Sequence, residues 1–328
     1  MGLSSSLSIA IFLLYFTSVL AGPDKKKPDY LTQIDGLDTD YYRKTCPKAE
    51  EIISKKVKHW ISKDYTLGAS LLRLHFHDCA IRGCDGSVLV NTTGSERYAK
   101  ASKTLRGFDV IDDIKAELED KCPKTVSCAD ILTAVARDAT HEIGGPYWSL
   151  KYGRKDGRKS LAEEAEGVPM GRESVTGLIQ FFQSKGLTLL DLVVLSGAHT
   201  IGRCSCGSIQ YRIYNYTEYG LADPSIDLKF LNFLQRKCRQ ASEYTELDAV
   251  TPTIFDSVYY KNLQQRMGLL STDQMLYADS RTGPLVKALA AQHNLFYQQF
   301  GVSMKKLSKV QVLTGDEGEV RTKCFAFN

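Results

Sequence analysis

Apolar residues recur every three to four positions through most of the chain, a spacing that predicts a mainly helical protein. Between positions 49 and 63, for example, Ile53, Val57 and Trp60 share one helical face. The same spacing predicts helices over 67–77, 108–121, 129–139, 174–185, 191–198, 229–240 and 259–266, and a longer stretch with a break over 283–306. Strand patterns are few and short, as around 148–152. We expect a mainly α fold of two helical lobes.

The N-terminus follows a different pattern. Residues 6–20 form a largely apolar run, which Ala21 and the polar segment GPDKKKP follow. This arrangement predicts a signal peptide over 1–21 and a polar lead-in over 22–36, leaving 37–328 as the folded domain. No Lys or Arg precedes the run, so an uncleaved signal anchor is the alternative. After cleavage we expect no membrane span.

Composition and charge narrow the function classes. The chain has 328 residues, enough for a sizeable core, and a formal net charge of only +4 with dispersed basic residues. A nucleic-acid partner is therefore not expected.

Cysteine usage agrees with export. The nine cysteines lack the paired CxxC spacing of a zinc site, and in an oxidising compartment they allow four disulfides with one thiol left over. Two glycosylation sequons begin at Asn91 and Asn215.

Residues 73–79, RLHFHDC, form the densest cluster of chemically active side chains. Arg73 and His77 are four positions apart, so on a helix they share one face. An imidazole beside a guanidinium suits peroxide cleavage, because the imidazole moves the proton while the cation stabilises the leaving oxygen. His75 points elsewhere and is interpreted as structural. A zinc site built on the His75-Phe76-His77 pattern is weaker, because no third ligand lies nearby.

A second cluster, DLVVLSGAHTIGR, spans 191–203. It reads as an apolar helix that ends in small residues and delivers His199 at its end. Small residues allow a flat macrocycle to approach the backbone, and a histidine there suits a haem axial ligand.

Seven motifs connect these clusters to a known family. They are ASLLRLHFHDC (69–79), GCDGS (83–87), RGFDVID (106–112), CPKTVSCADIL (122–132), LSGAHTIG (195–202), TPTIFD (251–256) and LLSTDQ (269–274). In content and order they resemble the class III plant secretory peroxidases from about position 37 to 324. The resemblance implies the haem-peroxidase fold, with haem b held non-covalently between a distal and a proximal lobe.

The resemblance also implies site residues. Arg73, Phe76 and His77 match the distal catalytic positions, and His199 matches the iron ligand. Asp273 matches the buried carboxylate that accepts the other ring N–H of the proximal histidine, which stabilises oxidised iron.

Two structural calcium ions are implied in the same way. The distal ligands match Asp78, Ile81, Gly83, Asp85 and Ser87, with Ile81 and Gly83 giving backbone oxygens. The proximal ligands match Thr200, Asp248, Thr251, Ile254 and Asp256. All are the oxygen donors that calcium prefers. Because Asp78 follows His77 and Thr200 follows His199, each ion is expected to tether a catalytic histidine.

The implied disulfides are Cys46–Cys122, Cys79–Cys84, Cys128–Cys324 and Cys206–Cys238. The family's half-cystine lies seven residues after the proximal histidine, which selects Cys206 and leaves Cys204 as the candidate free thiol. The reverse assignment, with Cys204 in the disulfide and Cys206 free, stays open at this point.

Two departures from the family pattern concern the site. Pro169 matches a proline whose carbonyl helps to bind aromatic reductants, but the common NLPxP reads GVPMG here and Arg172 follows. The family segment EKxAxxNxxSLRGF reads ERYAKASKTLRGF, one residue shorter and without the asparagine that orients the distal histidine. Ala101 or Ser102 falls at that place. Our hypothesis is that His77 is a less well oriented base, and that asparagine at 101 or 102 speeds the peroxide step.

The expected activity is the reduction of hydrogen peroxide coupled to one-electron oxidation of phenolic donors such as lignin precursors, outside the cell or in the wall. By analogy the protein is a monomer. The alternative is a cell-wall-binding haem protein with weak activity, which the missing asparagine and altered substrate edge favour.

Overall fold

The computed structural model describes residues 36–328, so the predicted signal peptide and nearly all of the lead-in lie outside the described residues. Within this range the architecture is helical. The α-helices are α1 Ala49–Lys63, α2 Leu67–Ile81, α3 Phe108–Lys121, α4 Cys128–Glu142, α5 Val175–Ser184, α6 Leu189–Ser196, α7 Cys206–Tyr214, α8 Leu228–Lys237, α9 Val258–Gln264, α10 Ser271–Ala278, α11 Gly283–Ala291 and α12 His293–Leu307. The mainly helical fold is confirmed.

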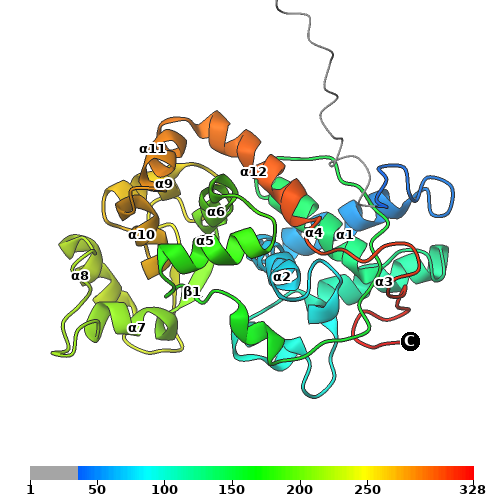
Figure 1. The fold of residues 1–328 in the computed structure, drawn as a ribbon, viewed down its shortest axis with the longest axis horizontal. Coiled ribbons are helices and arrows are strands. Elements are labelled where there is room, and N and C mark those ends of the chain that lie inside the picture. The colour runs from blue at the N-terminus through cyan, green and yellow to red at the C-terminus, as the bar shows by residue number, and fades with distance from the viewer. Residues whose placement is uncertain (1–35) are drawn as a thin grey trace, which may run out of the picture. The chain divides into compact units, whose positions relative to one another are not determined.

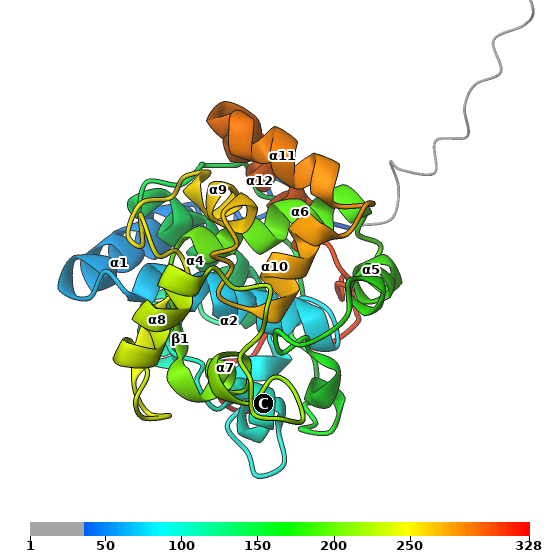
Figure 2. The ribbon, with the colours of Figure 1, turned by 90° about the vertical axis from the view of Figure 1, so that its left-hand side faces the viewer.

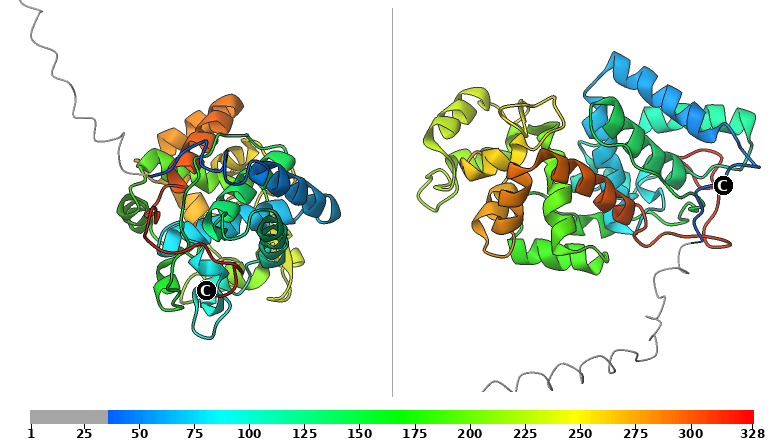
Figure 3. Two further views of the ribbon diagram at one scale, coloured as in Figure 1. Left: turned by 90° about the vertical axis from the view of Figure 1, so that its right-hand side faces the viewer. Right: turned by 90° about the horizontal axis from the view of Figure 1, so that it is seen from above.

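Helix α2 lies between two groups of helices (Figure 1). On one side α1, α3 and α4 pack together, and α2 packs against α4. On the other side are α5, α6 and α9 to α12, in which α6 contacts α5, α11 and α12. A quarter turn brings α6 and α10 into view near α2 (Figure 2), and the view from above shows the two groups again (Figure 3).

The core explains this arrangement. Every residue of α4 from Cys128 to Thr140 is buried, which makes α4 the central helix of its lobe. Its first turn is capped by Ser127, whose hydroxyl accepts from the Asp130 N–H at 3.1 Å. One apolar cluster joins both lobes, and a second, around Ile209, Phe230 and Leu234, lies under α7 and α8. The lobes therefore share a core.

The sequence prediction missed some elements. Residues 148–152 form no strand; Tyr152 makes only an isolated bridge to Asp38. The two strands of the described part are β1 Arg203–Ser205 and β2 Tyr244–Glu246, which pair antiparallel. Helices α7 and α10 were not predicted, because both are short and lack a long apolar repeat. The predicted break within 283–306 is confirmed at Gln292.

Within residues 36–328 no single helix has the length and apolar composition needed to cross a bilayer. Only the helix pair Val175–Ser184 and Leu189–Thr200, taken together, has that length and composition, and the pair is bent by 109° at its break.

Helix α6 ends at Ser196, and His199 lies in the following 3-10 turn η5, Gly197–Thr200, rather than on the helix itself. Gly197 is required here by protein packing. A Cβ at this position would lie 2.3 Å from Tyr260 Oη and 2.5 Å from Phe296 Cε2. Gly197 therefore makes room for two aromatic side chains of the protein itself.

We expect Gly197→Ala to lower the free energy of unfolding by about 1–3 kcal/mol, because the added methyl forces buried rings to move. Chemical denaturation measures this change. Gly301→Ala on α12 is the matched control: its Cβ would meet Trp148 at an ordinary 3.5 Å, so it is expected to be neutral or slightly stabilising. Equal losses in both variants would contradict the packing argument.

Candidate functional site

His199 is fixed by a buried carboxylate from another helix. Its Nδ1 lies 2.9 Å from Asp273 Oδ1, and Asp273 is 1% exposed. Asp273 belongs to the first turn of α10, where its Oδ2 accepts from the Leu270 N–H at 3.3 Å. Burial opposes a charged imidazole, yet the charge and hydrogen bond of Asp273 raise the pKa of His199. The ring is therefore oriented with Nε2 directed away from Asp273.

Tyr259 of α9 completes this pair, and the sequence analysis missed it. Its hydroxyl donates to Asp273 Oδ1 at 2.9 Å, and its ring packs edge-on against His199 with centroids 6.2 Å apart. The side chain is buried, and burial raises its pKa, so it remains a donor. The only sequence signal was its place just after the TPTIFD motif.

Arg73, Phe76 and His77 lie together on α2. Arg73 Nη1 donates to the carbonyl and hydroxyl oxygens of Thr104 at 3.2 and 3.0 Å, and Nη2 donates to the Ala101 carbonyl at 3.2 Å. Burial, with the charge of Arg73, lowers the pKa of His77 to about 3. His77 is therefore a neutral base near neutral pH.

Arg73 connects the two histidine sites electrostatically. Next to the effect of burial, its charge lowers the pKa of His77, and it also opposes protonation of His199, so the guanidinium lies within electrostatic reach of both rings. The His199 side chain is 34% accessible, although Gly197 and Thr200 of the same turn are buried. The His199 ring is therefore open on one side.

The positions assigned to the distal calcium form a buried acidic group. Asp78, Asp85 and Ser87 are at most 3% exposed, and Asp78 accepts from the Gly86 N–H at 3.0 Å. Burial, followed by repulsion from Asp85, raises the pKa of Asp78. Glu96, which the sequence analysis did not single out, accepts from the Ser87 hydroxyl at 3.1 Å, and burial next to these acids raises its pKa to about 9. A buried group of carboxyl side chains such as this one is stabilised by a cation that balances its negative charge.

Ile81 and Gly83 are the two backbone positions assigned to that set. The Ile81 carbonyl accepts from Lys185 Nζ at 2.7 Å, and the Gly83 carbonyl accepts from the Asp85 N–H at 2.9 Å. Gly83 has a φ of 109°, and a Cβ there would meet the Gln311 carbonyl at 2.5 Å, so only glycine fits.

The positions assigned to the proximal calcium are joined by close contacts between oxygen atoms. Thr200 Oγ1 lies 3.3 Å from the Ile254 carbonyl and 3.4 Å from Asp256 Oδ1, which Thr251 Oγ1 approaches to 3.2 Å. Thr251 Oγ1 also lies 3.4 Å from Asp248 Oδ2. Five oxygen atoms are therefore linked by successive contacts of 3.2–3.4 Å around the residue that follows His199.

The four disulfides implied by the resemblance are present: Cys46–Cys122, Cys79–Cys84, Cys128–Cys324 and Cys206–Cys238. Cys204 of β1 is the free cysteine of the described residues, and burial raises its pKa to about 11. The choice between Cys204 and Cys206 is thereby resolved in favour of Cys206.

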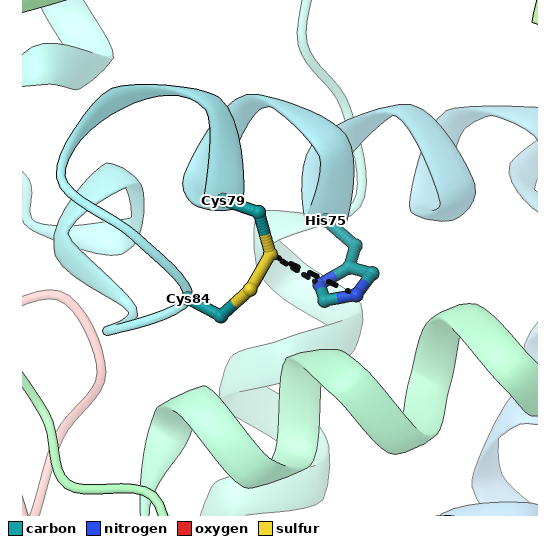
Figure 4. A group of neighbouring side chains, drawn as sticks. All are labelled: His75, Cys79 and Cys84. Atoms are coloured by element: carbon teal, nitrogen blue, oxygen red, sulfur yellow. Dashed lines mark hydrogen bonds between the residues drawn. A yellow bond between two sulfur atoms is a disulfide. The ribbon is translucent and has the colours of Figure 1, made fainter. Parts of the chain in front are cut away.

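His75 lies beside the Cys79–Cys84 disulfide (Figure 4). Its Nδ1 is 3.5 Å from Cys79 Sγ, and Cys79 is bonded to Cys84. His75 is 1% exposed, and burial lowers its pKa to about 3. Both sulfurs are consumed by the disulfide, so this group offers no thiolate, and the zinc reading gains no support.

The remaining predicted positions lie at the surface or its edge. Pro169 is half-buried and follows Val168, which packs with Ala80 and Ala101 beside Phe76. Arg172 is exposed and stacks over the Tyr211 ring at 4.0 Å. Asn91 and Asn215 are exposed, as an acceptor of a glycan must be.

The fold and the paired histidine sites are those of a haem peroxidase. The family model described as Peroxidase matches residues 53–292. The chain is 55% identical over 311 residues to Peroxidase 7 of Arabidopsis thaliana, covering 94% of this chain and 89% of that protein. It is 41% identical to Peroxidase 71 of Arabidopsis thaliana over the full length of both chains, and 41% identical to Peroxidase 4 of Vitis vinifera over 99% of each. The chain belongs to the plant secretory peroxidases and is a peroxidase enzyme.

The residues present fit the haem that this family carries. His199 keeps Nε2 available with its Nδ1 already paired to Asp273, the arrangement that second-sphere carboxylates impose on a metal-binding imidazole. His77 is neutral and Arg73 is cationic, and the charge of Arg73 reaches both imidazoles.

We expect Asp273→Asn to lower the rate of the peroxide step by about 10–100-fold, because the imidazole loses its anionic partner. The midpoint potential of the iron should rise at the same time, since a less electron-rich ligand stabilises oxidised iron less. Stopped-flow absorbance and redox titration measure the two. Tyr259→Phe, which removes one hydrogen bond and keeps the carboxylate, should shift both in the same direction by less. An unchanged potential in Asp273→Asn would contradict this role.

A pH profile tests the state of His77. Because its pKa is lowered to about 3, the neutral base persists at every pH well above that value. The peroxide rate constant should therefore stay level from about pH 5 to 7 and fall only toward pH 3. Arg73→Gln removes the charge that lowers the pKa of His77 and leaves the effect of burial, so this pKa rises and the loss of rate in acid begins at a higher pH. Arg73→Lys keeps the charge, so its rate should fall over the same pH range as in wild type. A loss of rate over the same pH range in the Gln and Lys variants would contradict this role of the Arg73 charge.

Proposed function

We propose that this peroxidase is a secreted enzyme that reduces hydrogen peroxide and oxidises small phenolic donors by one-electron steps. The observation that carries the proposal is the combination of His199, held by Asp273, with neutral His77 and with Arg73, whose charge reaches both imidazoles. No other cluster among the described residues combines a metal-binding imidazole, a base and a permanent cation.

The proposed holder of haem b is His199 Nε2. The bound haem supplies the electrons that reduce peroxide and is restored by electrons from two donor molecules. His77 takes the proton from the near peroxide oxygen and returns it to the departing one, so that water leaves. Arg73 stabilises the negative charge on the departing oxygen, Phe76 packs edge-on beside His77, and Asp273 keeps the proximal imidazole electron-rich.

Two calcium ions are proposed beside the two histidines. Support comes from the donor sets. The distal set holds two buried carboxylates whose pKa values are raised by burial, and the proximal set links hydroxyl, carboxylate and carbonyl oxygens in successive contacts of 3.2–3.4 Å. A divalent cation neutralises such acids and matches their oxygen chemistry.

The proposed location is outside the cell or in the wall, with the chain acting as a monomer. The four disulfides and two exposed sequons support an oxidising, glycosylating route. Phenolic wall components, such as lignin precursors, are the proposed donors, and Pro169 at the rim of the distal lobe is their proposed contact.

The test is stopped-flow absorbance of the purified haem-loaded protein, mixed first with hydrogen peroxide and then with guaiacol. We expect the Soret band to lose intensity within the first mixing and to return stepwise as guaiacol is oxidised. Metal analysis of the same sample should find two calcium ions per chain. His77→Leu is the control, since it keeps haem and loses the base. A Soret band that does not respond to peroxide would overturn the proposal and favour a wall-binding haem protein.

A further inference from the structure

The segment over residues 168–172 connects the distal lobe to the proximal lobe. At one end, Val168 packs in the small apolar cluster beside Phe76 of α2. At the other end, the Gly171 carbonyl accepts from the N–H of Thr272, in the first turn of α10, at 3.3 Å. The segment therefore runs between the two helices that carry the distal and proximal catalytic side chains.

Arg172 ends this segment, and both its backbone and its side chain are held in place. The three successive backbone N–H groups of residues 170–172 donate to the Glu173 carboxylate at 2.7–3.0 Å. The guanidinium of Arg172 lies 4.0 Å above the Tyr211 ring, and its Nη2 donates to the Ser208 carbonyl at 3.4 Å. A guanidinium that is already fixed by stacking loses little freedom when it binds a further group.

The charge of this guanidinium has no carboxylate partner. Within residues 36–328 the Arg172 side chain is exposed and forms no ion pair. The acid next to it in sequence, Glu173, has its carboxylate bound to backbone N–H groups. The other acid nearby, Asp223, is paired with Arg212 at 2.8 Å. Most N–H donors of the Arg172 guanidinium are therefore available to an anion that approaches from solvent.

The residue that supports Arg172 on α7 is connected to the catalytic site. Burial raises the pKa of the Cys204 thiol, while a hydrogen bond with the Ser208 hydroxyl lowers it. The charges of Arg73 and Asp273 also act on this thiol, in opposite directions. Cys204 thus lies within electrostatic reach of the distal cation and of the proximal carboxylate, and Ser208 joins it to the surface position of Arg172.

We propose that Arg172 selects phenolic donors that carry a carboxylate. The inference rests on the proposed function: the phenol end of the donor lies at Pro169, and its carboxylate binds the guanidinium of Arg172. Three residues of chain span at most about 10 Å, and a hydroxycinnamate separates its hydroxyl from its carboxylate by one ring and a two-carbon chain. One donor of this class therefore reaches both positions.

The carboxylate takes no part in the electron transfer. The phenol gives up its electron and its proton as in the proposed function, while the carboxylate accepts two N–H groups of the planar guanidinium fork. A neutral alcohol with the same ring lacks this contact. Arg172 is thus expected to favour phenolic acids over the corresponding alcohols.

The experiment compares two donors that share one ring. Ferulate carries a carboxylate where coniferyl alcohol carries a neutral hydroxymethyl group. After the haem-loaded protein has reacted with hydrogen peroxide, stopped-flow absorbance gives the second-order rate constant for each donor. We expect Arg172→Gln to lower the constant for ferulate about threefold to tenfold and to leave the constant for coniferyl alcohol unchanged. Comparing each donor with its own wild-type value removes the intrinsic difference in their reactivity.

Two further variants separate charge from local packing. Arg172→Lys keeps the charge and should retain most of the preference for ferulate. Arg97→Gln is the matched control, because it removes the same charge from a guanidinium stacked at 3.8 Å on Phe108 of α3, and both donors should react with it as with wild type. An equal fall for both donors in Arg172→Gln, or an unchanged constant for ferulate, would overturn the inference.

A second readout needs no turnover. Isothermal titration of the haem-loaded protein with ferulate, without peroxide, measures Kd directly. We expect Kd to rise about threefold to tenfold in Arg172→Gln, and to rise with salt in wild type because an exposed ion pair is screened. Equal ferulate affinity in wild type and Arg172→Gln would overturn the inference. Failure of the proposed function would show instead as a wild-type Soret band that does not respond to peroxide, and the titration would still decide whether Arg172 binds the carboxylate.

Discussion

A charged or polar side chain inside a protein needs a partner, and helix α2 places four such side chains, Arg73, His75, His77 and Asp78, in or at the edge of the interior within six residues. Arg73 is held by carbonyls of the 101–104 segment, Asp78 by the backbone that follows the Cys79–Cys84 loop, and His75 lies against that disulfide. Because these partners come from the turns between α2 and α3, those turns cannot move without moving the catalytic face. Polar groups on the proximal side are paired in the same way. Asp273 pairs with His199 and accepts from Tyr259, and the oxygen atoms assigned to the proximal calcium follow His199.

Much of this could be predicted from the sequence. The 3.6-residue spacing located the long helices, with α1 and α3 matching at both ends, because their apolar faces are continuous and their ends carry charged residues. The catalytic positions and the four disulfides followed from the resemblance, since motifs keep their order in a chain even when the residues they join lie far apart. His199 and Asp273 are 74 positions apart, and no spacing rule alone would pair them.

What could not be predicted depends on tertiary contacts. Gly197 is small because Tyr260 and Phe296 approach it, and neither ring is near it in sequence. The strands β1 and β2 are three residues each and exist only through their pairing. Tyr259 and Glu96 act through hydrogen bonds whose partners lie 14 and nine positions away, so composition and periodicity contain no trace of them.

The unpaired Cys204 bears on how long such an enzyme survives its own substrate. Peroxide reacts with the thiolate and not with the thiol. It oxidises the thiolate first to sulfenic acid and then to irreversible products. With burial raising its pKa to about 11, on the order of one Cys204 side chain in ten thousand is ionised at neutral pH, and fewer in an acidic wall. The odd cysteine is therefore protected by its surroundings from oxidative ageing and from cross-linking to a second chain, in a protein that works in the presence of an oxidant throughout its life.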